Sequence, residues 1–130
     1  AFISVREFVS MGLTCFIGSC RLVLPALTMG AAGCVDGPPG CFPMPYLKIW
    51  DAFHRGDLES AATAQDQGTA LCELFIRWPY IASAKALMSE QIGVDCGPPR
   101  APTRALTADE RVELVAAMRD VGALQPTSVA

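Results

Sequence analysis

Six cysteines and one histidine are the residues of this sequence best suited to metal binding or disulfide formation. The histidine is His54, and the cysteines are Cys15, Cys20, Cys34, Cys41, Cys72 and Cys96. No two cysteines have the Cys-x-x-Cys spacing by which two thiolates bind one zinc ion, and one histidine cannot supply a second ligand pair. The surroundings of Cys15 are apolar and no secretory signal is visible. The sequence therefore predicts reduced cysteines that pack as small hydrophobic residues. The alternative is the disulfide framework of a small secreted domain.

The sequence contains two lysines that could supply a nucleophilic amine, Lys48 and Lys85. A lysine that forms a Schiff base must be neutral at the working pH, which requires burial or cationic neighbours. Lys48 precedes Trp50 on an amphipathic segment, and nothing places Lys85 at the end of a strand. We therefore predict that neither is a nucleophile. His54 lies near a predicted helix C-terminus, which favours a surface role that complements the helix dipole over a role as a base.

The composition indicates one globular domain and excludes several classes of protein. The 130 residues include 10 basic and 13 acidic ones, for a net charge of −3, so no basic surface for nucleic acid is expected. Between Phe8 and Val35 only Arg21 is charged. This stretch is too interrupted for the roughly 20 apolar residues of a membrane span, because it contains Gly12, Gly18, Pro25, Gly30 and Gly33. No signal peptide is visible, which predicts a cytoplasmic protein without a membrane partner.

The first third of the chain predicts a helix followed by two short strands that flank a second helix. Ser4 and Glu7 have the spacing of a capping box, so the first helix is expected over residues 4–11 with Gly12 as its end. The strands are expected over Leu13–Ile17 and Ala32–Asp36, and the second ends at a Gly37-Pro38-Pro39-Gly40 turn. The helix between them covers residues 21–29. Strands joined by a helix pair in parallel through a right-handed crossover, which indicates an α/β fold.

The remainder of the chain predicts four helices. The first has an apolar stripe and ends near Gly56, and the second begins after Asp57 and ends before Trp78-Pro79. Small residues in the second helix indicate that another helix approaches it closely; they are Ala61, Ala64 and Gly68. The third ends at Gly93, and an extended link follows over residues 94–106. Thr107 and Glu110 form a second capping box for the last helix, and residues 123–130 are expected to be a frayed tail.

Four stretches of the sequence form a recognisable pattern. They are Ile17-Gly18-Ser19, Leu24-Pro25-Ala26-Leu27 with Gly30-Ala31-Ala32-Gly33, Cys34-Val35 with its Gly-Pro-rich loop, and Gly93 with Gly97-Pro98-Pro99-Arg100-Ala101-Pro102 to Leu106. These stretches resemble the dihydrodipicolinate synthase and N-acetylneuraminate lyase family of Schiff-base aldolases. Their order and spacing fit that family without insertions, over about Phe2 to Leu124.

The resemblance implies the C-terminal portion of a (β/α)8 TIM barrel followed by a helical segment. Residues 1–56 would form the last two βα units, residues 57–124 the C-terminal helical segment and residues 125–130 a tail. A complete barrel needs about 250 residues. The resemblance therefore implies a missing N-terminal half as a partner. In the family this half carries the Schiff-base lysine on strand six, and no metal or other cofactor is required. The complete protein is expected to be a homo-oligomer.

The predicted substrate-binding set for pyruvate or another 2-keto acid is Gly18, Cys20, Arg21, Val35 and Gly37, of which the resemblance implies Gly18 and Val35. Gly18 would end strand seven and Val35 would lie in strand eight, both lining the pyruvate pocket. Strand alternation places Gly33, Val35 and Gly37 on one face, and Cys34 and Asp36 on the other. The alternative for Gly18 and Val35 is purely structural, a turn and a filler of the barrel.

The residues after Gly18 depart from the family pattern. Sialic-acid lyases of the family carry acids there, whereas this chain has Ser19, Cys20 and Arg21, which argues against a polyhydroxy sugar acid. Arg21 is a candidate for a bidentate pair with a substrate carboxylate. The alternative is that Arg21 pairs with a nearby acid or extends into solvent. A different functional class also stays open, in which the chain is a non-catalytic helical module for interaction or oligomerisation.

Overall fold

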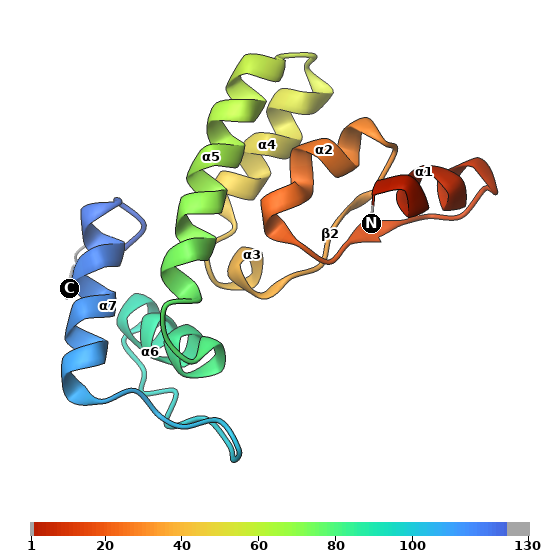
Figure 1. Ribbon diagram of the computed structural model, residues 1–130. Helices are drawn as coiled ribbons and strands as arrows, with labels where there is room; N and C mark the ends of the chain where they lie inside the picture. Colours follow the sequence, from red (N-terminus) through yellow and green to blue (C-terminus); the bar gives the residue numbers. More distant parts are fainter. Residues whose placement is uncertain (1, 125–130) are drawn as a thin grey trace. The chain divides into compact units, whose positions relative to one another are not determined.

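The computed structural model describes residues 2–124, and the predicted tail over residues 125–130 lies outside them. The prediction of a frayed tail from residue 123 is wrong for Ala123 and Leu124, because both donate to the Met118 carbonyl and Leu124 is buried. Two compact units divide the chain, Ala1–Ala70 and Leu71–Ala130. The first unit holds both strands (Figure 1). The elements are α1 Phe2–Ser10, β1 Phe16–Ile17, the 3-10 helix η1 Cys20–Leu22, α2 Val23–Thr28, β2 Gly33–Cys34, α3 Gly37–Cys41, α4 Met44–His54, α5 Leu58–Phe75, α6 Tyr80–Ile92 and α7 Ala108–Asp120. Across residues 2–124 we find no helix with the length and apolar character of a membrane span.

The predicted parallel pairing of the two strands is confirmed. Phe16 lies opposite Gly33, and Ile17 lies opposite Cys34. Further hydrogen bonds join the Ala32 N–H to the Cys15 carbonyl at 2.7 Å and the Val35 N–H to the Ile17 carbonyl at 3.0 Å. The strands are nevertheless shorter than predicted. Leu13 donates its N–H to the Phe8 carbonyl at 3.0 Å, so its backbone completes the end of α1 and cannot also start a strand.

The two faces of this small sheet differ in burial. Ile17 is buried in a cluster with Val5, Ala26 and Ala31, and Cys34 packs against the same cluster. On the opposite face the side chains of Phe16 and Val35 are 56% and 72% exposed. The Phe16 ring lies over Gly33, where an added Cβ would be 3.3 Å from it. Parallel strands are ordinarily covered on both faces, so one face of this sheet is left open by the residues described.

Two further predictions for the first unit are wrong. Ser4 does not cap a helix, because α1 already begins at Phe2. The Gly37-Pro38-Pro39-Gly40 segment is not a simple turn but the start of α3, with Asp36 as its N-cap. Asp36 and Gly37 therefore lie outside the strand, and the strand alternation that we extended through Gly37 ends before it.

The predicted close approach of a helix to the small residues of α5 is confirmed. The Tyr46 hydroxyl on α4 donates a buried hydrogen bond to the Gly68 carbonyl on α5 at 2.9 Å. A Cβ on Gly68 would lie 2.8 Å from the Tyr46 ring. Asp57 accepts the Ser60 N–H at 3.0 Å, as expected for the N-cap of α5. A glycine at this contact thus lets α4 and α5 lie side by side (Figure 1).

The second unit follows its sequence signals closely. Gly93 ends α6 in the left-handed conformation, with φ of 69°. Thr107 and Glu110 form the predicted capping box of α7. Arg104 adds a bidentate ion pair to Glu110, with both N–O distances at 2.7 Å. The core of this unit includes Leu87, Leu114 and Met118, which are fully buried.

Candidate functional site

The carboxyl ends of β1 and β2 lie at the same edge of the sheet because the strands are parallel. Gly18 follows directly after Ile17, and Val35 follows directly after Cys34. The Val35 N–H bonds to the Ile17 carbonyl at 3.0 Å, so Gly18 and Val35 flank the last hydrogen bond of the ladder. Two of the predicted site residues are thus brought together.

Gly18 and Val35 are both exposed. A Cβ built on Gly18 would meet no atom within 4 Å, so the backbone there borders open space within the described chain. The Val35 side chain is 72% exposed, so it does not fill the core of its own unit. An open backbone beside an apolar side chain suits the close approach of a small ligand. Their role in substrate binding stays a prediction.

Cys20 and Arg21 form the start of η1, one turn after β1. The Cys20 side chain is fully buried, so contact with a substrate is not favoured by its placement. Arg21 is half-buried on the same turn. The substrate roles of Cys20 and Arg21 stay predictions, as does that of Gly37, the first residue of α3.

Asp36 is a residue of this edge that the sequence analysis did not select. Its Oδ2 accepts the Cys20 N–H at 2.8 Å, and its Oδ1 accepts the Gly37 N–H at 2.7 Å. Asp36 therefore joins the segment after β1 to the start of α3. The signal was present, since an aspartate before Gly37-Pro38 is a typical N-cap with proline in the first turn.

Gln65 on α5 is the second residue that the sequence analysis missed. Its side chain is buried, accepts the Leu24 N–H at 2.9 Å and donates to the Cys20 carbonyl at 3.0 Å. A glutamine on the same helix as the buried Ala61 and Ala64 was the available signal, because a buried amide needs hydrogen-bond partners. Gln65 thereby supports η1 and the first turn of α2.

Cys34 lies on the buried face of the sheet, one residue before Val35. Burial raises the pKa of its thiol to about 11, with a smaller contribution from the negative charge of Asp36. The thiol therefore stays protonated at neutral pH. All six cysteines have free thiols in the structure. Among residues 2–124 no group of three or more His, Cys, Asp or Glu side chains could hold a metal ion.

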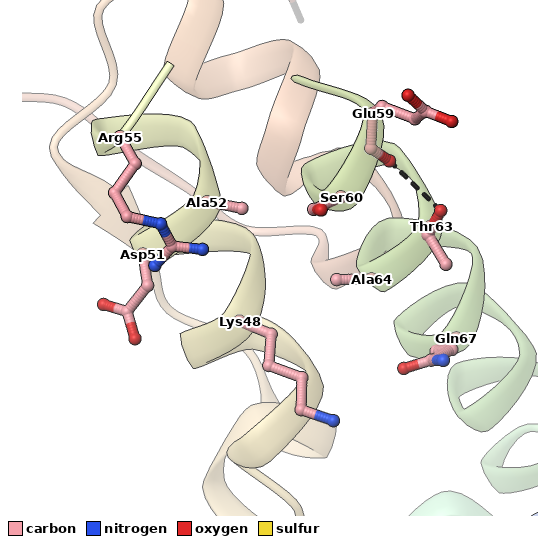
Figure 2. Close-up of a pocket in the computed structure, with 9 residues that line it drawn as sticks. All are labelled: Lys48, Asp51, Ala52, Arg55, Glu59, Ser60, Thr63, Ala64 and Gln67. Atoms are coloured by element: carbon pink, nitrogen blue, oxygen red, sulfur yellow. Dashed lines mark hydrogen bonds between the residues drawn. The ribbon is translucent and has the colours of Figure 1, made fainter. Parts of the chain in front are cut away.

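Neither lysine directly follows a strand in the chain, since Lys48 is on α4 and Lys85 is on α6. Lys85 on α6 donates a hydrogen bond from its ammonium group to the Cys96 carbonyl. Lys48 is exposed on α4, where it lines an open groove of about 450 Å³ between α4 and α5 (Figure 2). Asp51, Arg55 and Glu59 also line this groove, so its charges are mixed. The groove contains none of the predicted site residues.

His54 ends α4 at the surface, as predicted. Its Nδ1 lies 2.8 Å from the Trp50 carbonyl oxygen, and its ring lies 4.1 Å from the Trp50 ring between centroids. These contacts belong to the end of the helix, so we assign His54 no part in the candidate site.

The chain as a whole is similar to a known class of enzymes in sequence and in fold. The chain is 35% identical over 112 residues to an uncharacterized DapA-like lyase of Halobacterium salinarum, which covers 86% of this chain and 36% of that protein. It is 32% identical over 114 residues to 4-hydroxy-tetrahydrodipicolinate synthase 1 of Streptomyces coelicolor, covering 86% and 37%.

A solved structure extends this likeness to three dimensions. The N-acetylneuraminate lyase of Proteus mirabilis superposes with a TM-score of 0.74 at 26% identity, over 84% of this chain and 37% of that protein. The chain thus spans little more than a third of the length of the proteins it matches. Its two parallel strands and helices agree with part of the TIM barrel of these lyases. The Dihydrodipicolinate synthetase family matches residues 1–121, and this chain belongs to that family.

Proposed function

We propose that this chain is part of a Schiff-base-forming lyase or aldolase that acts on pyruvate or a related 2-keto acid. The observation that carries the proposal is the meeting of Gly18 and Val35 at the carboxyl ends of two parallel strands. In TIM barrels this end of the strands is the place of the active site. The family membership of the chain supports the same reaction class.

The amine that attacks the keto carbon comes from a part of the enzyme outside this chain. Attack by a neutral lysine and loss of water give an imine, which accepts the electron pair when a carbon–carbon or carbon–oxygen bond breaks. Lys85 is engaged with the Cys96 carbonyl, and Lys48 lies in an open groove with mixed charges. Lys48 is exposed, and neither lysine directly follows a strand of this chain.

In this proposal Gly18 and Val35 line part of the substrate pocket. The open backbone at Gly18 lets the keto acid approach closely, and the exposed face of Val35 supplies apolar contact. Arg21 is the proposed partner of a substrate carboxylate. Ser19, Cys20 and Arg21 offer no acidic group for sugar hydroxyls, so the preferred substrate is a keto acid that is not a polyhydroxy sugar.

The test uses the product of the complete reading frame that contains this chain. Borohydride reduction in the presence of pyruvate adds the mass of pyruvate less one water plus a hydride and a proton to the reactive lysine. We expect this adduct on one lysine outside the present sequence. An adduct on Lys48 or Lys85 overturns the assignment of the amine to another part of the enzyme. The absence of any adduct overturns the proposed reaction class and favours the helical interaction module.

Matched glycine variants show whether the adduct depends on this site. Gly18→Val places a side chain in the open space beside the strand end and is expected to abolish trapping. Gly40→Val is the control, because a Cβ at Gly40 also meets no atom within 4 Å. Equal trapping by both variants would show that Gly18 is not part of the site.

Replacing Arg21 tests its proposed ion pair with the substrate carboxylate. Arg21→Met should raise the pyruvate concentration needed for half-maximal trapping, and an unchanged concentration would exclude this ion pair.

A further inference from the structure

We propose that Asp36 is a positioning residue of the candidate site, which holds the segment after β1 at a fixed place relative to Val35. This inference rests on the proposed function, because it concerns the same strand ends. Asp36 directly follows Val35 and reaches across to a residue 16 positions earlier, where its Oδ2 accepts the Cys20 N–H at 2.8 Å. Its other oxygen accepts the Gly37 N–H at 2.7 Å.

The Asp36 bond lies beyond the end of the ladder. The Val35 N–H to Ile17 carbonyl bond is the last one between the strands themselves. Past that point the chain turns into η1 on one side and α3 on the other. Hydrogen bonds from a backbone N–H to a carboxylate are shorter and stronger than bonds between neutral groups. The Asp36 carboxylate therefore links the segments that follow β1 and β2, beyond the last backbone hydrogen bond between the strands.

The Cys20 peptide groups are held from two directions. The Cys20 N–H bonds to Asp36, and its carbonyl accepts from Gln65 at 3.0 Å. Gln65 also accepts the Leu24 N–H at 2.9 Å, which ties the same side chain to α2. Gly18 lies two residues before this fixed point, and Arg21 lies one residue after it. The positions of both depend on Asp36 and Gln65.

The hydrogen bonds of the Asp36 carboxylate favour a positioning role over a direct chemical role. Both carboxylate oxygens accept backbone N–H groups of the protein. Asparagine at this position replaces one oxygen by an amide group that donates, so one of the two backbone N–H groups loses its acceptor. The segment carrying Gly18 is then free to move away from Val35, and a small shift of a binding group costs affinity.

The test compares Asp36→Asn with Asp57→Asn in the product of the complete reading frame. Asp57 also accepts a backbone N–H, but from Ser60 at the start of α5 and not from a residue that follows a strand. We expect Asp36→Asn to raise the pyruvate concentration for half-maximal borohydride trapping by about tenfold. Asp57→Asn keeps an amide oxygen that can accept the Ser60 N–H, and it should leave that concentration unchanged. Equal half-saturation in the wild type and Asp36→Asn overturns the inference.

Hydrogen exchange gives a readout that does not depend on catalysis. The Cys20 and Gly37 amides should exchange faster in Asp36→Asn and at the wild-type rate in Asp57→Asn. If the wild type traps no pyruvate, the proposed function fails, while unchanged exchange at Cys20 and Gly37 would separately overturn the role of Asp36. Should Asp36→Asn not fold, Asp36→Ser keeps one oxygen that can accept a backbone N–H and enters the same comparison.

Discussion

The hydroxyl of Tyr46 donates a hydrogen bond to the carbonyl of Gly68, and the Tyr46 ring occupies the space that a side chain at Gly68 would need. The two residues lie on α4 and α5, 22 positions apart. Their contact sets how closely these helices approach, and it leads to the first prediction.

Replacing Gly68 by alanine should destabilise the protein by about 1 kcal/mol. Overpacking costs about 1–3 kcal/mol, and the better helix propensity of alanine returns up to about 1 kcal/mol. Urea denaturation of the variant measures the change. Gly40→Ala is the control, since its Cβ meets no atom within 4 Å, and it should be neutral or slightly stabilising. A Gly68→Ala variant that is more stable than the wild type would show that α4 and α5 can move apart without loss of stability.

The capping box of α7 should make stability depend on acid pH. The bidentate bond from Arg104, aided by the Thr107 N–H, lowers the pKa of Glu110 from 4.5 to about 2. Because the folded state favours the carboxylate, its stabilising effect is complete above pH 4.5 and is lost as the pH falls towards 2. The difference in unfolding free energy between the wild type and Glu110→Gln should therefore shrink over this range. Glu113→Gln, outside the capping box, is the control, and a difference independent of pH would contradict the assignment.

The Cys34 thiol should react slowly with iodoacetamide in the folded protein. Its pKa is raised to about 11, first by burial and then by the charge of Asp36, and only the thiolate is an effective nucleophile. Peptide mapping after alkylation at pH 8 should find Cys34 largely unmodified, and urea should restore its reactivity. Asp36→Asn should increase the rate modestly, since burial is the larger cause. Rapid alkylation of the folded wild type would show that the sheet opens readily.

The 130-residue chain expressed alone should be prone to aggregation. Its sheet has two strands among the residues described, and Phe16 and Val35 are exposed on one face. Unpaired strand edges and open apolar faces promote association. We expect binding of a hydrophobic dye and light scattering that Phe16→Lys reduces. Val112→Lys is the control, because Val112 is 69% exposed and belongs to helix α7, not to a strand. A sharp, cooperative thermal transition of a soluble monomer would contradict the prediction.

The sequence predicted the helices better than the strand ends, for a physical reason. Gly93 and Thr107 mark helix ends through local backbone preferences, and the structure confirms both. Strand length depends instead on partners that are distant in sequence. Leu13 has the composition of a strand residue, but its N–H is used by the Phe8 carbonyl. Asp36 and Gln65 were missed because their partner, Cys20, lies 16 and 45 residues away.

The hydrogen bond between Asp36 and Cys20 couples the two loops that follow the strands. In loop grafting between relatives the two loops should be treated as one unit. A chimera that takes one loop from one relative and the other loop from a second relative separates an acceptor from its donor. Grafting experiments that aim at a new specificity should therefore transplant residues 18–22 and 35–37 together. The segments to exchange are thus defined by the Asp36–Cys20 hydrogen bond and not by one continuous stretch of sequence.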